Sequence, residues 1–282
     1  MSSRDADEIL VLGRGDVAQA TPMRDLIAEI DKFFREAPIS IQPQRIISSM
    51  EGGVWLFMPS YIRGYGVVVK TVNEYQLPNH AHGIVEIYDG KTGVPLAVIN
   101  AVEVTLRRTG ALGGLAVKYV YGGKSAVVGL IGSGDQARGQ LEGIASVLMV
   151  ERAYVYSRHR EGRERFSAEM SSELGIDVVA LEDPRKAVEL ADVVVTATNS
   201  TVPVLDGRWL REGSHVNSLG TLPDRRELDG ETFKRASKVV FDTKEGVMRE
   251  AGDVIHAIQE KALDEGKIVG ELADVIRSGG LR

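Results

Sequence analysis

The pattern of hydrophobic and polar positions divides the chain into a first part with one helix and several strands and a second part in which strands and helices alternate. The first helix is predicted to begin at Thr21–Pro22, because threonine is a good N-cap and proline suits the first helical position. Its apolar side chains share one face at helical spacing and are Met23, Leu26, Ile27, Ile30 and Phe33. Pro38 ends this segment, because the residue before a proline disfavours helical backbone.

Short strands separated by glycine and aspartate clusters follow between Ile39 and Asn100. They are predicted at Val54–Met58, Gly66–Lys70, Gly83–Tyr88 and Leu96–Ile99. Asp89–Gly93 has the composition of a hairpin turn between the last two. A long helix rich in small residues, Val102–Tyr119, then leads to the second part of the chain.

From Ser125 onward, apolar runs of strand length alternate with helical patterns. Strands are predicted at Ser125–Ile131, Ala153–Tyr156, Asp177–Ala180, Asp192–Ala197, His215–Ser218 and Lys238–Phe241. This alternation predicts a parallel sheet that is doubly wound, with helices on both faces. We therefore expect an α/β protein with an α+β domain over residues 1–118 and a Rossmann domain over residues 119–282.

A glycine-rich turn directly follows the first strand of this second part. Gly132, Gly134 and Ala137 match the G-x-G-x-x-G/A pattern, with Asp135 and Gln136 between them. The small residues allow a pyrophosphate to approach the backbone, and the following helix offers free N–H groups and the positive end of its dipole. The strand–turn–helix setting favours a dinucleotide site over the alternative, a tight turn that binds nothing.

Composition narrows the function further. The chain has 282 residues with 43% hydrophobic and 26% charged residues, a net charge of −6 and no cysteine. The acidic balance argues against a nucleic-acid partner, and the lack of cysteine excludes disulfides and thiolate catalysis. No uncharged apolar stretch reaches the length of a membrane span and no leader pattern opens the chain, so we expect a cytoplasmic protein without a membrane partner.

The second strand bears on the choice of dinucleotide. An NAD site usually places an acid at its end, about 20 residues past the glycine motif, to bind the ribose diol. Here Ser157 occupies that place and Arg158 follows. A serine and an arginine could bind a 2′-phosphate, so we expect NADP(H) in preference to NAD(H). We interpret Arg163 and Arg165 as the solvated face of the next helix, paired with nearby glutamates.

Several segments resemble those of the ornithine cyclodeaminase/mu-crystallin family. The matching segments are Leu106–Thr109, Gly132–Gln140, Ala191–Ser200, Pro203–Leu205, Arg226–Asp229 and Glu250–Asp253. The resemblance implies a Rossmann domain joined to a substrate domain that also forms a homodimer interface. It further implies hydride transfer between C4 of a nicotinamide and the α-carbon of a small amino or imino acid. Members include ornithine cyclodeaminases, alanine dehydrogenases and reductases of ketimines and pyrroline carboxylates.

The resemblance also implies roles for three cations in the first part. Arg45 and Arg108 match arginines that bind the substrate carboxylate, which a planar guanidinium can pair bidentately. Lys70 matches a lysine that follows a glycine–valine strand. Beside two arginines its pKa should be lowered, so it could transfer protons to the substrate nitrogen. Lys70 and Arg45 are thus the expected catalytic residues, and the alternative for each is an ordinary surface cation.

Further site residues follow from the same resemblance. Thr198, Asn199 and Ser200 would line the nicotinamide ribose, because they follow a strand whose carboxyl end faces the cofactor crevice. Thr109 and Gly220 complete the expected cofactor set. Thr221 stands where ornithine cyclodeaminases carry an aspartate that binds the side-chain amine, and we expect it to contact substrate.

Thr221 departs from the ornithine cyclodeaminases at this position. The stretch Pro223–Asp229 resembles instead the mu-crystallins of the family, which reduce ketimines with NADPH. We therefore expect a reductase or an alanine dehydrogenase-like enzyme. Alternatives are an ornithine cyclodeaminase that forms proline and ammonia, and a non-catalytic NADP(H)-binding protein. Family members usually continue past the segment matching Gly270–Arg282. His80 and His82 lack a third metal ligand at a convincing spacing, so no metal is expected.

Overall fold

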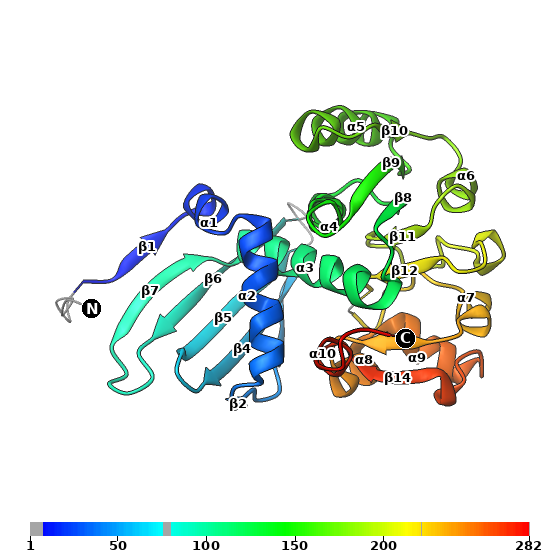
Figure 1. Cartoon of the computed structure of the whole chain (residues 1–282). Coiled ribbons are helices and arrows are strands. Elements are labelled where there is room, and N and C mark those ends of the chain that lie inside the picture. The colour runs from blue at the N-terminus through cyan, green and yellow to red at the C-terminus, as the bar shows by residue number, and fades with distance from the viewer. Residues whose placement is uncertain (1–7, 76–79, 221, 282) are drawn as a thin grey trace. The chain divides into compact units, whose positions relative to one another are not determined.

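The computed structural model describes residues 8–75, 80–220 and 222–281. The chain forms two compact units, Met1–Arg108 and Thr109–Arg282, and the boundary between them lies inside helix α3 (Ala101–Ala116). The sequence boundary was expected after residue 118. The α/β class is confirmed, with a parallel sheet in the second unit (Figure 1). In the described ranges no helix combines the length and apolar character needed to cross a membrane.

The first unit is built on a mainly antiparallel sheet. Its strands are β1 (Leu10–Leu12), β2 (Ser40–Ile41), β3 (Ile46–Met50), β4 (Gly53–Ile62), β5 (Gly66–Tyr75), β6 (His80–Tyr88) and β7 (Pro95–Asn100). They lie in the order β1-β7-β6-β5-β4-β2, and β3 pairs with β4. The hairpin predicted between β6 and β7 is confirmed, because the Asp89 carboxylate accepts hydrogen bonds from the N–H groups of Lys91 (3.0 Å) and Thr92 (2.7 Å).

Two helices, α1 (Arg14–Ala20) and α2 (Met23–Glu36), lie in the chain between β1 and the other strands of this sheet. The prediction that Thr21 caps the second helix was wrong. Pro22 occupies the N-cap position, and the Thr21 hydroxyl instead donates to the carbonyl of Val17 (2.7 Å) at the end of α1. Helix α1 was not expected from the sequence, so the hydrogen bond between Thr21 and this helix could not be anticipated.

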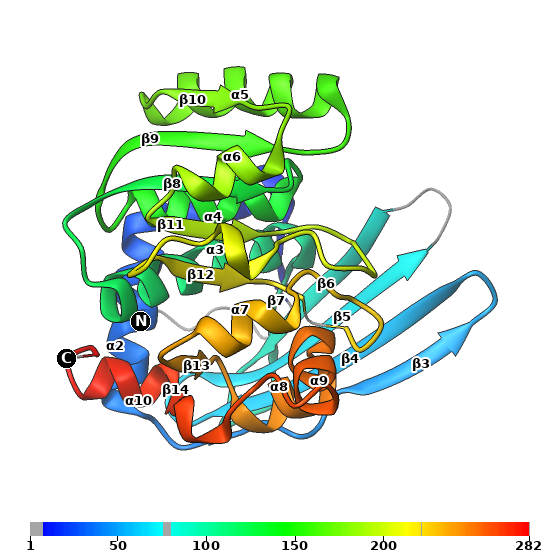
Figure 2. The ribbon, with the colours of Figure 1, turned by 90° about the vertical axis from the view of Figure 1, so that its right-hand side faces the viewer.

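The second unit contains the predicted parallel sheet. Its strands are β8 (Ser125–Ile131), β9 (Met149–Tyr156), β10 (Val178–Ala180), β11 (Val193–Thr196) and β12 (His215–Ser218). Their order, β10-β9-β8-β11-β12, is that of a Rossmann fold, with a switch point between β8 and β11 (Figure 2). The connecting helices are α4 (Asp135–Ala145), α5 (Arg160–Leu174) and α6 (Pro184–Glu189). Buried valines, leucines and alanines of the strands pack against α4 and α5.

The last strand predicted for this sheet lies elsewhere, which corrects the sequence analysis. β13 (Val239–Phe241) pairs in parallel with β14 (Ile268–Glu271) in a separate sheet (Figure 2). Helices and turns of this region are η2 (Gly207–Trp209), α7 (Gly230–Arg235), α8 (Lys244–Glu250), α9 (Gly252–Gln259), η3 (Glu265–Lys267) and α10 (Leu272–Arg277). A second apolar cluster, with Phe233, Phe241 and Val254, supports them. Local pattern predicts a strand but not its partner, so the error is one of pairing.

The small residues of α3 serve close helix packing within the second unit. A Cβ added to Gly110 would lie 2.2 Å from the carbonyl oxygen of Gly139 in α4, and one added to Gly113 would collide with the Gln140 side chain. The helix continues into a short π-helix, η1 (Val117–Tyr121). This packing explains the glycine and alanine content of the predicted helix, because only small residues allow the two backbones to approach so closely.

Candidate functional site

The glycine-rich turn has the geometry that a dinucleotide requires. Gly132 follows β8 with φ of +117°, a conformation that favours glycine, and its added Cβ would lie 2.3 Å from the carbonyl oxygen of Ala197. Its N–H donates to the carbonyl of Tyr156 (2.8 Å) at the end of β9. Gly134 is the N-cap of α4, so the free N–H groups of that helix begin at the turn. Ala137 is fully buried, where the motif calls for a small residue.

Two features of this turn fit a bound dinucleotide. Gly134 has ordinary φ and ψ of −90° and −175°, and an added Cβ would meet nothing within 4 Å. Nothing in the described chain therefore requires glycine there, whereas close approach of a phosphate would. The Gln136 side chain also has a buried Oε1 without a hydrogen-bond partner among the described residues, which a hydroxyl of a ligand could satisfy.

The end of β9 carries no acid in the structure. Ser157 lies directly beside the turn, because the Ser133 hydroxyl donates to the Ser157 hydroxyl (2.9 Å). Arg158 is exposed and makes no hydrogen bond or ion pair among the described residues. The interpretation of Arg163 as solvated was wrong. Its side chain is buried, with 8% of the residue exposed, and it donates to the carbonyl of Ser157 (3.1 Å). Arg163 therefore holds the backbone of Ser157, which lies beside the glycine turn.

Thr198, Asn199 and Ser200 lie at the same sheet edge as the glycine turn. They follow β11, which pairs directly with β8, and the N–H of Ala197 donates to the carbonyl of Ile131 (2.9 Å). The structure thus brings the loop Thr198–Ser200 and the turn at Gly132 together at the switch point. Open α/β sheets bind their ligands at this position.

The segment Arg225–Glu227, to which the sequence assigned no site residue, holds this loop. The Glu227 carboxylate accepts the N–H of Thr198 (2.5 Å), and the N–H of Arg226 donates to the carbonyl of Ser200 (2.9 Å). The guanidinium of Arg225 donates to the carbonyl of Asn199. Arg226 and Glu227 do fall in a segment matched to the family, but no local pattern reveals that they contact a loop so far away in the sequence.

Asp253 holds the backbone of the segment that contains Glu227. Its buried carboxylate accepts the N–H groups of Glu227 (2.6 Å) and Leu228 (2.9 Å) and the hydroxyl of Ser218 (2.8 Å). An added Cβ on Gly220 would lie 2.9 Å from the same carboxylate, so the network also approaches an expected cofactor residue.

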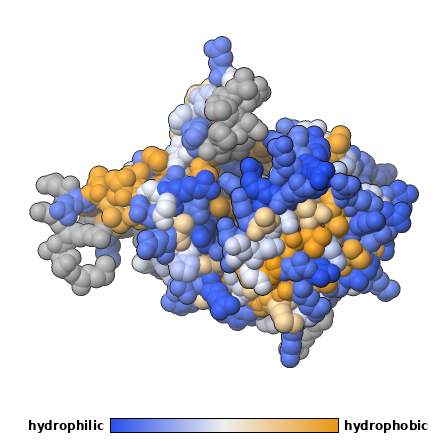
Figure 3. Space-filling view, turned by 90° about the horizontal axis from the view of Figure 1, so that it is seen from above, coloured by the Kyte–Doolittle hydropathy of each residue, from blue (hydrophilic) through white to orange (hydrophobic). Residues whose placement is uncertain are grey.

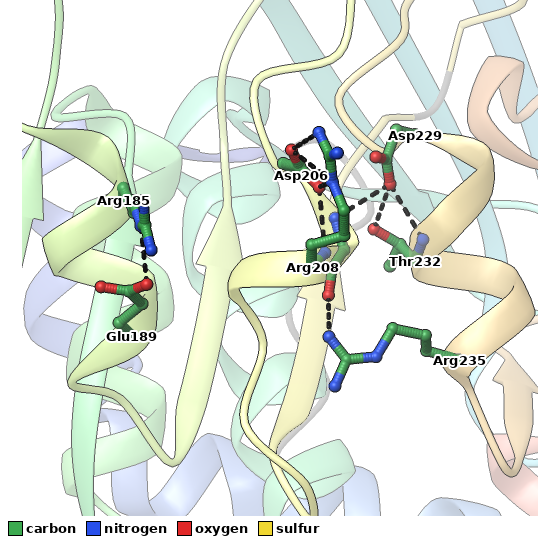
Figure 4. A network of polar contacts seen from close by, with 8 residues as sticks. Arg185, Glu189, Asp206, Arg208, Asp229, Thr232 and Arg235 are labelled. Carbon is green, nitrogen blue, oxygen red and sulfur yellow. Dashed lines mark hydrogen bonds and ion pairs between the residues drawn. The ribbon is translucent and has the colours of Figure 1, made fainter.

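The far end of the segment is fixed as well. Asp229 caps α7 by accepting from the N–H of Thr232 (2.9 Å), and it also accepts from the N–H of Gly207 (3.1 Å). Arg235 donates to the carbonyl of Gly207 (2.5 Å), and Figure 4 shows these contacts between η2 and α7. The chain on both sides of Glu227 is therefore held by hydrogen bonds to other segments.

In the first unit, Lys70 lies between two strands at the middle of the sheet. It belongs to β5 and pairs with Met58 of β4 and Val85 of β6. Burial, then the charges of Arg108 and Arg45, lower the pKa of Lys70 from 10.5 to about 8. The structure thus brings Lys70 under the field of both arginines that the resemblance assigns to the substrate carboxylate. Such a cationic group can bind an anion and exchange a proton near neutral pH.

The remaining predicted residues are placed differently. The carbonyl of Thr109, on α3, accepts a hydrogen bond from the Gln140 side chain (2.7 Å), so its backbone contributes to the packing of α3 on α4. Thr221 lies outside the described residues, as does the side chain of His80. Within the described part of the chain, no group of three metal-binding side chains occurs.

Comparison with known proteins confirms the resemblance seen in the sequence. A curated relative, the delta(1)-pyrroline-2-carboxylate reductase of Bacillus cereus, is 35% identical over 92% of this chain and 85% of its own length. The Thermococcus litoralis delta(1)-pyrroline-2-carboxylate reductase, solved with NADH and L-proline, is 37% identical with a TM-score of 0.91, over 96% and 87% of the two chains. An archaeal alanine dehydrogenase dimer with bound NAD is 28% identical, with a TM-score of 0.87 over 96% and 86%. The ornithine cyclodeaminase/mu-crystallin family model matches residues 7–280, and the chain belongs to this family.

Proposed function

We propose that this protein is a nicotinamide-dependent reductase of small cyclic α-imino acids, with pyrroline-2-carboxylate as the model substrate. The observation that carries the proposal is Lys70, whose pKa is lowered to about 8 by burial and by Arg108 and Arg45. A group with that pKa exchanges protons at physiological pH, and its two cationic neighbours suit a substrate carboxylate. The likeness to two pyrroline-2-carboxylate reductases supports the same substrate class.

The proposed reaction balances with one hydride and one proton. When bound, the cofactor supplies the hydride from C4 of its nicotinamide. Arg45 and Arg108 bind the carboxylate and so orient the α-carbon. The ammonium of Lys70 donates a proton to the imine nitrogen as the carbon–nitrogen double bond becomes a single bond. The product is the cyclic amino acid, and neutral Lys70 regains its proton from solvent.

The first experiment follows the nicotinamide absorbance of purified protein with NADPH or NADH. Pyrroline-2-carboxylate, piperideine-2-carboxylate, and pyruvate with ammonia would be offered in turn. We expect oxidation of the cofactor with the cyclic imines, and a loss of at least about 100-fold in Lys70→Met. The matched control is Lys91→Met, a change in the exposed β6–β7 turn.

Other outcomes of this assay would point elsewhere. Turnover confined to pyruvate and ammonia would indicate an alanine dehydrogenase. Conversion of ornithine to proline and ammonia without net cofactor use would indicate a cyclodeaminase. Full turnover of Lys70→Met would contradict the role given to Lys70.

NADP(H) is the cofactor we propose in preference to NAD(H). Support comes from Ser157, which replaces the usual acid beside the glycine turn, and from the exposed Arg158. An acid there would repel a 2′-phosphate, whereas a hydroxyl and a guanidinium can bind one.

The preference is testable by two substitutions. In Arg158→Ala the KM for NADPH should rise about tenfold while the KM for NADH stays unchanged, since a charge-assisted contact to phosphate is lost. Arg165→Ala, at an exposed position of α5, is the control. Ser157→Asp should favour NADH. Equal effects of Arg158→Ala on both cofactors would contradict the proposal.

A homodimer formed through the first unit is the assembly we propose. β1 is an edge strand, and Ile9, Leu10 and Val11 are exposed, Val11 by 73%. This apolar surface is the orange patch at the left of Figure 3. A dimeric alanine dehydrogenase is among the similar structures. Analytical ultracentrifugation should show a dimer for the natural chain and a monomer for Val11→Lys, whereas Val269→Lys in β14 should remain dimeric.

A further inference from the structure

Glu227 is a buried acid, and among the described residues no cation pairs with its carboxylate. The residue is 0% exposed. The charged group that acts on it is a second acid, Asp253 of α9, and that charge raises its pKa further. The guanidinium groups of its own segment are engaged elsewhere, Arg225 on the Asn199 carbonyl and Arg226 on Glu260 (2.5 Å). Burying a carboxylate without a paired cation costs free energy, and in the described chain only hydrogen bonds offset that cost.

The two carboxylate oxygens of Glu227 lie at the end of β11 and at the loop that follows it. Oε1 accepts the N–H of Thr198 (2.5 Å). Oε2 is buried, as is the hydroxyl of Thr196, and neither makes a hydrogen bond of normal geometry within the described residues. The Thr196 hydroxyl is nevertheless close enough to lower the pKa of the Glu227 carboxyl. The carboxyl thus spans the point where β11 gives way to the loop Thr198–Ser200.

The backbone of Glu227 is held by hydrogen bonds that do not involve its side chain. Asp253 holds the N–H groups of Glu227 and Leu228, and the carbonyl of Glu227 accepts from the N–H groups of Val204 (2.8 Å) and Leu205 (3.1 Å). A weaker contact between the carboxyl and Thr198 is therefore felt by the loop rather than by the Glu227 segment.

We propose that Glu227 is a positioning residue that sets the loop Thr198–Ser200 for the nicotinamide end of the cofactor, and that it holds the loop more firmly when ionised than when protonated. This inference rests on the proposed role of that loop in cofactor binding. A carboxylate is a stronger acceptor than a carboxylic acid, so protonation loosens the hold on the Thr198 amide.

The change falls within the physiological range. Burial, the largest effect, and the charge of Asp253 raise the pKa of Glu227 from 4.5 to about 7, although the N–H and hydroxyl contacts of Thr198 and Thr196 oppose the rise. Cofactor affinity should therefore increase as pH rises from 6 to 8.

The test is a fluorescence titration of NADH, whose phosphates do not titrate in this range, into the whole protein between pH 5.5 and 8.5. We expect the Kd of the natural chain to be about fivefold lower at pH 8 than at pH 6, the difference between a charged and a neutral acceptor. Glu227→Gln should give a flat profile. Glu212→Gln changes an exposed acid that precedes β12 and is the matched control. It should keep the pH dependence of cofactor binding that the natural chain shows.

The outcomes separate this inference from the proposed function. A flat profile for the natural chain, or a dependence that persists in Glu227→Gln, overturns the inference and leaves the reductase intact. If no nicotinamide cofactor binds at any pH, the proposed function fails. In that case, or if Glu227→Gln fails to fold, amide hydrogen exchange of the cofactor-free natural chain tests the inference. Loop amides, corrected for intrinsic rates, should lose protection below pH 7, and unchanged protection would overturn it.

Discussion

Gly110 of α3 and Gly139 of α4 touch backbone to backbone, so that a Cβ on Gly110 would lie 2.2 Å from the Gly139 carbonyl oxygen. We predict that Gly110→Ala lowers the free energy of unfolding by about 1–3 kcal/mol, because the helices must separate. Gly15→Ala is the matched control, since an added Cβ in helix α1 meets nothing within 4 Å, and it should be neutral or stabilising. Urea unfolding measures both, and equal stability of the two variants would contradict the packing described.

Gly134 should separate cofactor binding from stability. An added Cβ has open space and the backbone angles suit any residue, so Gly134→Val should keep the melting temperature of the natural chain. The side chain would occupy the space that a pyrophosphate needs, and we expect at least about tenfold weaker cofactor binding. Gly132→Val should lose both properties, because φ is +117° and Ala197 is too close. Thermal unfolding with cofactor titration tests both variants, and unimpaired binding by Gly134→Val would argue against the phosphate site.

If Lys70 transfers the proton, the rates of imine reduction and of amino acid oxidation should depend on pH in opposite ways. Because its pKa is lowered to about 8, the ammonium that donates the proton disappears above that pH. Imine reduction should therefore fall about tenfold per pH unit above pH 8, and oxidation of the cyclic amino acid should rise up to about pH 8 and then level. Lys70→Arg does not titrate in this range and should remove both limbs. Initial rates between pH 6 and 10 measure this, and limbs retained by Lys70→Arg would assign them to another group.

Glu227 also predicts a pH dependence of stability. Its pKa is raised from 4.5 to about 7 in the folded chain, so the folded state holds the proton more tightly than the unfolded state. The carboxyl contributes its full stability below about pH 4.5, and this contribution is lost as pH rises through 7. The free energy of unfolding of the natural chain, relative to Glu227→Gln, should fall by about 3 kcal/mol between pH 4.5 and pH 8. Urea unfolding at several pH values measures the difference, and a constant difference would contradict the shift.

The elements with strong local signals could be predicted from the sequence. β8 and β12 have the predicted bounds, Ser125–Ile131 and His215–Ser218. Short elements such as β1 and α1 could not, because β1 is only three residues long with mostly exposed apolar side chains, and α1 buries only Val17. Pairing also escaped prediction: β13 has the pattern of a sheet strand, but which strand it joins depends on contacts across the chain.

The same division holds for the candidate site. The sequence by itself determined the glycine turn and the missing acid at Ser157, because both depend on spacing within one strand–turn–helix unit. It also indicated Lys70 and its two arginines through the family resemblance. Only the tertiary structure decided that Arg163 is buried beneath Ser157 and that Glu227 and Asp253 hold the loop after β11. Burial and long-range hydrogen bonds arise when distant segments meet, and no local periodicity records such a meeting.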